Sequence, residues 1–302
     1  MPLPFKIIYS PKYHVKIGDH VFPTDKYLLV YNRLLREHLC DEKDFICPVP
    51  ASKDDLLLVH TRDYVDKLLN GRMSTSDLMR LELPFSRELV EASMICVEGT
   101  IETCRYALKD GIGIHIGGGF HHSFPGHGEG FCVFNDVAVG IKKLMQEALI
   151  KKAMVVDCDL HHGNGTALIF QNDKSVFTFS IHQENNYPVI KPPSDIDVGL
   201  YDGTGDKEYL ENLNKHIPLI INEFKPQLLV YVAGADPYEN DKLGGLLLTL
   251  EGLKARDEVV FNACKANNVS VASVLAGGYA TDVQDTVTIH YNMIKGAIGL
   301  WK

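Results

Sequence analysis

The apolar positions of the chain fall into short continuous runs that are separated by longer segments with helical spacing. The runs do not alternate strictly between apolar and polar residues, which is typical of strands covered on both faces, as in a parallel sheet. The clearest predicted strands are 111–116, 153–160, 175–182, 227–234 and 269–278.

The segments between these runs have the period of amphipathic helices. In one of them, Leu89, Ala92, Ile95 and Cys96 share a face that can stay dry. The predicted helices are 86–108, 134–150, 206–223, 249–267 and 282–300. Alternation of strand and helix predicts a doubly wound or barrel-like α/β fold. No repeat or linker interrupts the pattern, so we predict a single domain over residues 1–302.

Composition narrows the class of protein. With 302 residues, of which 45% are hydrophobic and 23% charged, the chain can form a sizeable core and is neither disordered nor collagen-like. The net charge of −9 argues against nucleic-acid binding and favours a cationic ligand, such as a lysine-rich peptide or a polyamine.

Targeting and redox signals are few. Seven cysteines without a CxxC motif predict neither a disulfide scaffold nor a thiolate zinc site. The start of the chain does not read as a signal peptide, and no apolar stretch approaches the roughly 20 residues that span a bilayer. We therefore expect a cytoplasmic protein without a membrane partner; no pattern in the sequence defines an oligomeric state.

Polar side chains gather where the predicted strands end. They are His121, His122, Asp157, Asp159, His161, His162, Asp236 and Tyr279. Ligands of open α/β sheets bind outside the carboxyl ends of the strands, so four strand ends converge on one candidate site.

Three of these residues have the spacing of a metal site. Asp157, Asp159 and His161 are two residues apart and point to one face of an extended chain. Asp236 adds a carboxylate from a distant segment. Two oxygen ligands and one nitrogen, with a position open for water, suit catalytic Zn²⁺ and also Fe²⁺ or Mn²⁺.

The neighbouring residues offer acid–base chemistry. His121 and His122 follow the glycines 117–119, and an imidazole pair beside a metal can deprotonate water and protonate a leaving amine. Tyr279 follows Gly277–Gly278, where its phenol can reach a substrate carbonyl and stabilise an oxyanion.

Six ordered stretches resemble motifs of the histone deacetylase superfamily. They are GGGFHHSF (117–124), GEGFCVFND (128–136), VVDCDLHHGNGT (155–166), FSIH (179–182), GADP (234–237) and LAGGY (275–279). Asn164 and the stretch 241–261 look most like class IV deacetylases and their bacterial relatives. The resemblance implies an arginase/deacetylase-like α/β fold, with a central eight-stranded parallel sheet flanked by helices. It also implies a zinc-dependent hydrolase that removes acetyl or longer acyl groups from lysine.

The resemblance also assigns roles to residues. Asp159, His161 and Asp236 would hold zinc, with Fe²⁺ as the alternative metal. His122 would be the general base and acid, His121 would hold charge in a pair with Asp157, and Tyr279 would polarise the carbonyl. Many relatives have an aspartate where this chain has Asn164, which predicts a lower pKa for His122.

Potassium and substrate contacts follow from the same resemblance. A K⁺ ion would be held by Asp157, Ser180 and the backbone carbonyls of Asp159 and His161. The acyl-lysine tunnel would be lined by Gly130 and Phe131. The segment HQENNYPVIKPP departs from the better-studied classes, and within it we select Tyr187 as the opposing aromatic residue. Independently of the resemblance, residues 70–85 are a candidate rim of the tunnel mouth.

Two other functions stay open at the level of the sequence. One is an acetylpolyamine amidohydrolase or another small-molecule amidohydrolase, which the acidic balance suits equally well. The other is a catalytically silent module that binds acyl-lysine. Such a module would lack a ligand, the base or the phenol, and this chain has all of them.

Overall fold

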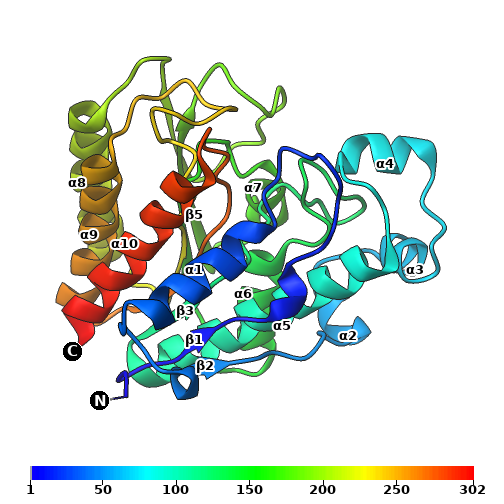
Figure 1. Cartoon of the computed structure of the whole chain (residues 1–302), viewed down its shortest axis with the longest axis horizontal. Helices are drawn as coiled ribbons and strands as arrows, with labels where there is room; N and C mark the ends of the chain where they lie inside the picture. The colour runs from blue at the N-terminus through cyan, green and yellow to red at the C-terminus, as the bar shows by residue number, and fades with distance from the viewer. Residues whose placement is uncertain (1) are drawn as a thin grey trace.

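The computed structural model describes residues 2–302 and forms one α/β domain around an eight-stranded sheet (Figure 1). All neighbouring strands are parallel, in the order β2-β1-β3-β8-β7-β4-β5-β6. The strands are β1 Ile7–Ile8, β2 Phe45–Ile46, β3 Ile112–His115, β4 Ala153–Asp157, β5 Val176–Gln183, β6 Ile196–Leu200, β7 Leu228–Val232 and β8 Ser270–Val274. The predicted α/β class and the eight-stranded parallel sheet are confirmed, and the sheet is open rather than closed into a barrel.

Helices cover both faces of the sheet. They are α1 Asp25–Arg36, α2 Lys53–Leu56, α3 Arg62–Leu69, α4 Thr75–Leu81, α5 Arg87–Asp110, α6 Asp136–Gln146, α7 Asn164–Phe170, α8 Asp206–Phe224, α9 Leu250–Ala266 and α10 Val283–Trp301. Two short 3₁₀ helices, Pro11–Tyr13 and Glu42–Asp44, complete the elements.

The alternation of side chains along each central strand builds two cores. In β4, Met154 and Val156 join the core that α1, α8, α9 and α10 cover, whereas Ala153 and Val155 join the core beneath α5 and α6. Figure 1 shows α1 running beside α10, with α8 and α9 at the left. Because the central strands are buried on both sides, their sequences are apolar without alternation.

Local capping explains where the longest helix begins and ends. The Ser86 hydroxyl accepts a hydrogen bond from the Leu89 amide at the N-terminus of α5. The helix ends at Gly111, which has a φ of 85°. A side-chain oxygen at the N-cap and a left-handed glycine at the end are the usual signals for helix termini.

Among the described residues, no helix is both long enough and apolar enough to cross a membrane.

Candidate metal centre and active site

The predicted polar residues lie at the carboxyl ends of strands that are neighbours in the sheet. His121 and His122 follow β3, Tyr279 follows β8, Asp236 follows β7 and Asp159 follows β4. These four strands are contiguous in the order β3-β8-β7-β4. Segments far apart in the sequence therefore meet at one edge of the sheet.

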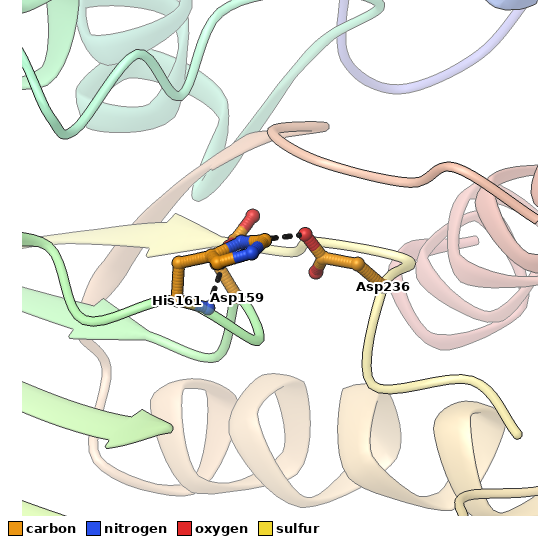
Figure 2. Close-up of side chains that lie close together, drawn as sticks. All are labelled: Asp159, His161 and Asp236. Carbon is orange, nitrogen blue, oxygen red and sulfur yellow. Dashed lines mark hydrogen bonds and ion pairs between the residues drawn. The ribbon is translucent and has the colours of Figure 1, made fainter. Parts of the chain in front are cut away.

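Asp159, His161 and Asp236 form a buried cluster at this edge. Each residue offers a ligand atom, and these atoms lie within 4.8 Å of one another. His161 Nδ1 is 3.1 Å from Asp159 Oδ1 and 3.3 Å from Asp236 Oδ2. Figure 2 shows Asp236 approaching from its own segment, opposite Asp159 and His161.

The cluster fits a divalent metal. Asp236 Oδ2 is buried and makes no hydrogen bond to any residue that the structure describes. A buried carboxylate oxygen without a donor is costly unless a cation satisfies it. Two carboxylates and one imidazole are a ligand set that zinc or iron(II) accepts, and further positions remain for water and substrate.

Backbone amides fix the ligands in place. The Gly277 amide donates to Asp159 Oδ2 at 2.9 Å, and the Leu160 amide donates to Asp236 Oδ1 at 2.9 Å. A Cβ at position 277 would overlap Asp236 Oδ2, so only glycine allows this close approach. These contacts therefore hold both carboxylates of the cluster by the backbone.

The two adjacent histidines are buried and differ in their partners. His121 Nδ1 lies 2.7 Å from Asp157 Oδ2, His122 Nδ1 lies 2.7 Å from Asn164 Oδ1, and the two Nε2 atoms are 3.1 Å apart. Burial lowers the pKa of His121, but the carboxylates of Asp157 and Asp159 outweigh it and raise that pKa to about 9.

The pKa of His122 moves in the opposite direction. Burial, followed by the positive charges of His121 and His161, lowers the pKa of His122 well below its usual value. The hydrogen bond that Asn164 Oδ1 accepts from His122 Nδ1 acts against this shift and does not cancel it. The pair thus combines a cationic His121 with a neutral His122, and a neutral imidazole can accept a proton.

A cavity of about 210 Å³ leads to this cluster. It is lined by Glu82, His122, Gly130, Phe131, His161, Asn186, Tyr187, Leu243 and Tyr279. The Phe131 and Tyr279 rings lie edge to face with centroids 6.0 Å apart, and the Tyr187 ring packs against His122 at 5.0 Å. Gly130, Phe131 and Tyr187, which the sequence analysis names as tunnel residues, line this cavity together with Tyr279.

The residues predicted to hold potassium are also neighbours. Asp157 and Ser180 face each other in register on β4 and β5. The Ser180 hydroxyl lies 2.9 Å from His182 Nδ1, and Asp157 Oδ1 accepts a hydrogen bond from the Asp159 amide. Their use for a cation stays a prediction.

Several residues of the cavity were not singled out by the sequence. Glu82 lies within the segment 70–85, which was predicted only as a rim. Asn186 and Leu243 come from loops whose local sequence has no distinctive pattern. Asp241 accepts a hydrogen bond from the Tyr279 amide, and burial together with Asp236 raises its pKa to about 7. These contacts are long-range, so no local signal indicates them.

A parallel α/β sheet thus carries a buried Asp–His–Asp cluster, an imidazole pair and a phenol at its carboxyl edge, a set of side chains that suits metal-assisted hydrolysis. The histone deacetylase domain matches residues 20–294, and the chain belongs to the histone deacetylase family.

Relatives share most of the length of the chain. It is 39% identical to an uncharacterized protein of Picosynechococcus sp., over 97% of this chain and 98% of that protein. It is 32% identical to histone deacetylase 2 of Arabidopsis thaliana, over 90% of this chain and 74% of the relative. The acetoin utilization protein AcuC of Bacillus subtilis is 30% identical, over 80% and 69% of the two chains.

Solved structures have the same fold. A crystal structure of a histone deacetylase homologue from Aquifex aeolicus superposes with a TM-score of 0.81 at 24% identity, covering 97% of this chain and 83% of the other. The HD domain of HDA15 gives a TM-score of 0.82 at 22% identity, covering 97% and 88%.

Proposed function

We propose that this chain hydrolyses the amide bond of an acylated lysine side chain, with a bound divalent metal, His122 and Tyr279 as the reacting groups. The observation that carries this proposal is the cavity in which His122, His161 and Tyr279 meet beside the buried Asp159 and Asp236. Phe131 and Tyr187 give the cavity aromatic walls that suit the aliphatic stem of lysine.

Asp159, His161 and Asp236 would hold the metal, which we propose to be zinc because the family is zinc-dependent, with iron(II) as the alternative. A bound divalent metal supplies a Lewis acid that polarises the substrate carbonyl and increases the acidity of water. Asp157 and Ser180 would hold potassium nearby.

His122 would move the proton in this reaction. Its Nδ1 is occupied by Asn164, so Nε2 is the atom that accepts a proton from the attacking water. The same atom returns the proton to the departing amine, which leaves as free lysine beside the carboxylate product. The depressed pKa of His122 keeps the base neutral before the reaction starts.

Tyr279 would stabilise the negative charge of the oxyanion, and His121 would offset the charge of the nearby carboxylates. Burial raises the pKa of Tyr279 well above its ordinary value, so the phenol keeps its proton and can donate a hydrogen bond to the developing oxyanion. His121 stays cationic beside Asp157 and offsets the charge of the surrounding carboxylates.

A second substrate class has a specific observation in its favour. The Glu82 carboxylate lines the same cavity, and a distal ammonium of an acylated polyamine would be attracted to it. An acylated polyamine would bring its second ammonium group close to Glu82, whereas an acyl-lysine peptide would bring its uncharged backbone to that position.

One assay separates these functions. The zinc-loaded protein is tested on lysine amides from acetyl to long-chain acyl, alongside acetylated polyamines, with and without a chelator and a hydroxamate inhibitor. We expect turnover of lysine amides that is lost with the chelator and with His122→Ala. Turnover confined to polyamines would favour the second class. Inactivity on every substrate with intact metal content would mean a binding module.

A further inference from the structure

Glu129 lies behind the imidazole of His122, one residue further along a hydrogen-bonded chain. Its Oε1 accepts a hydrogen bond from Asn164 Nδ2 at 2.7 Å, and Asn164 Oδ1 in turn contacts His122 Nδ1. Glu129 is held by a tight turn, because its amide donates to the Cys132 carbonyl and the Cys132 amide donates back.

Glu129 is present as a carboxylate. Burial raises its pKa, but hydrogen bonds from His127 and Asn164 outweigh that and lower it. Its Oε2 lies 3.3 Å from His127 Nε2, and its side chain is 22% exposed. An ionised carboxylate only accepts hydrogen bonds.

That property fixes the orientation of the Asn164 amide. The edge facing Glu129 must be the NH₂ group, so the oxygen must face His122. The Gly165 amide donates to the same oxygen at 3.0 Å and agrees with this orientation. Because an amide oxygen accepts, His122 must carry its hydrogen on Nδ1.

The contact with Asn164 therefore selects the tautomer of His122 that has its hydrogen on Nδ1 and a lone pair on Nε2. That lone pair is what a base acting at Nε2 needs.

We propose that Glu129 is a positioning residue, which fixes the Asn164 amide and through it the tautomer of His122 that can act as a base at Nε2. The role of His122 as the base rests on the function proposed above. Glu129 also places a full negative charge one amide away from His122.

Three variants test the positioning role through activity. Glu129→Met removes the acceptor at similar length, and kcat should fall about tenfold with little change in KM, as for other residues that orient a catalytic group. Asn164→Asp alone places two carboxylates face to face at the 2.7 Å contact and should also lower kcat about tenfold.

The double variant Asn164→Asp/Glu129→Gln is the decisive member of the set. It moves the carboxylate next to His122 and gives it an amide donor, so kcat should recover to within about threefold of the native enzyme. A native kcat for Glu129→Met, or a double variant no faster than Asn164→Asp alone, would overturn the proposal.

A spectroscopic readout separates this inference from the deacylase function. In zinc-loaded protein with ¹⁵N-labelled histidine, the His122 nitrogens should show hydrogen on Nδ1 alone, and Glu129→Met should give a mixture of tautomers. Glu82→Met, which removes a carboxylate that lines the cavity but makes no hydrogen bond to Asn164, should leave these signals unchanged. Identical His122 signals in the native protein and Glu129→Met would contradict the positioning role, even if no acyl substrate is turned over.

Discussion

At the scale of single residues, Tyr279 is the sharpest test of the proposed chemistry. Its hydroxyl is the donor expected to stabilise the oxyanion, so Tyr279→Phe should lower kcat by about two to three orders of magnitude. The ring packing against Phe131 and Phe22 would persist in the variant, and KM should change little. Steady-state kinetics on the best lysine amide of the panel measures both.

A matched control comes from the same side of the sheet. Tyr27 is buried, and its hydroxyl finds no hydrogen-bond partner within residues 2–302. Tyr27→Phe therefore removes a hydroxyl without removing a hydrogen bond, and it should keep kcat within about twofold. Normal turnover by Tyr279→Phe would mean that the oxyanion is stabilised elsewhere.

At the scale of secondary-structure elements, the turn at Gly130 packs closely against the residues of the site. Gly130 has a φ of 52°, and a Cβ there would lie 2.8 Å from His122 Cδ2 and 2.9 Å from Tyr187 Cε1. Gly130→Ala should strain the turn by about 1–2 kcal/mol and narrow the cavity. We expect kcat/KM to fall at least about tenfold, since a small misplacement of reacting groups is costly.

Gly126→Ala is the matched control in the same loop. Apart from its two chain neighbours, a Cβ at Gly126 meets no atom of residues 2–302 within 4 Å, and that position has no positive φ. Its kcat/KM should match that of the native protein. Equal activity of the two alanine variants would show that the loop yields easily at Gly130.

A side chain of helix α9 contacts the ends of both strands, β4 and β7, that precede the carboxylate ligands. Arg256 Nη1 donates to the Gly234 carbonyl at 2.5 Å and to the Cys158 carbonyl at 3.3 Å, just before Asp236 and Asp159. The guanidinium is fully buried and is paired with Asp257 at 2.8 Å. A helix side chain thus ties the ends of β4 and β7 together.

Arg256→Met should break this tie. Leaving the Asp257 carboxylate buried and unpaired costs about 3–5 kcal/mol of unfolding free energy, which urea denaturation measures. Zinc affinity should fall in parallel because the two ligand segments loosen. Adding Asp257→Asn should restore part of the stability but not the affinity; an unchanged affinity in Arg256→Met would show that the ligand segments hold without the tie.

The sequence predicted elements well where a local pattern exists. The predicted helix 86–108 is α5, Arg87–Asp110, and the predicted strand 175–182 is β5, Val176–Gln183. The predicted strand 153–160 is shorter, because β4 ends at Asp157 where the polar ligands begin. The two-residue strands β1 and β2 are too short to show any period.

The residues of the site differ in the same way: some have a local sequence signal and others depend on long-range contacts. Asp159, His161 and His122 stand at strand ends, where topology and spacing point to them. Glu129 and Glu82 gain their meaning from contacts across the fold, such as the bond from Glu129 to Asn164 over 35 residues. No local spacing encodes such a contact, so only the folded chain shows it.

At the scale of the whole molecule, buried neutral histidines should set the acid limit of stability. His60 is the clearest case: its Nδ1 lies 3.0 Å from the Phe124 carbonyl, and its Nε2 accepts a hydrogen bond from the Asn135 amide. Protonation of His60 would place a hydrogen on Nε2, where it would face the N–H group of Asn135. Burial lowers the pKa of His60 to about 4, and burial likewise lowers the pKa values of His115 and His182 to about 3.

The direction of the pH effect follows from these shifts. Each histidine has a pKa near 6.5 when unfolded, so below pH 6.5 the unfolded chain takes up a proton that the native protein does not. Stability is therefore full above pH 6.5 and falls as the pH drops toward 4. Each such residue should cost about 2 kcal/mol at pH 5.

Urea unfolding of the zinc-loaded protein between pH 7.5 and 5 measures this decline in stability. His60→Gln, whose side chain can still donate and accept, should reduce the slope by about one proton, or 1.4 kcal/mol per pH unit. The same change at exposed His38 is the matched control for the substitution itself. An unaltered slope in His60→Gln would show that His60 titrates alike in both states.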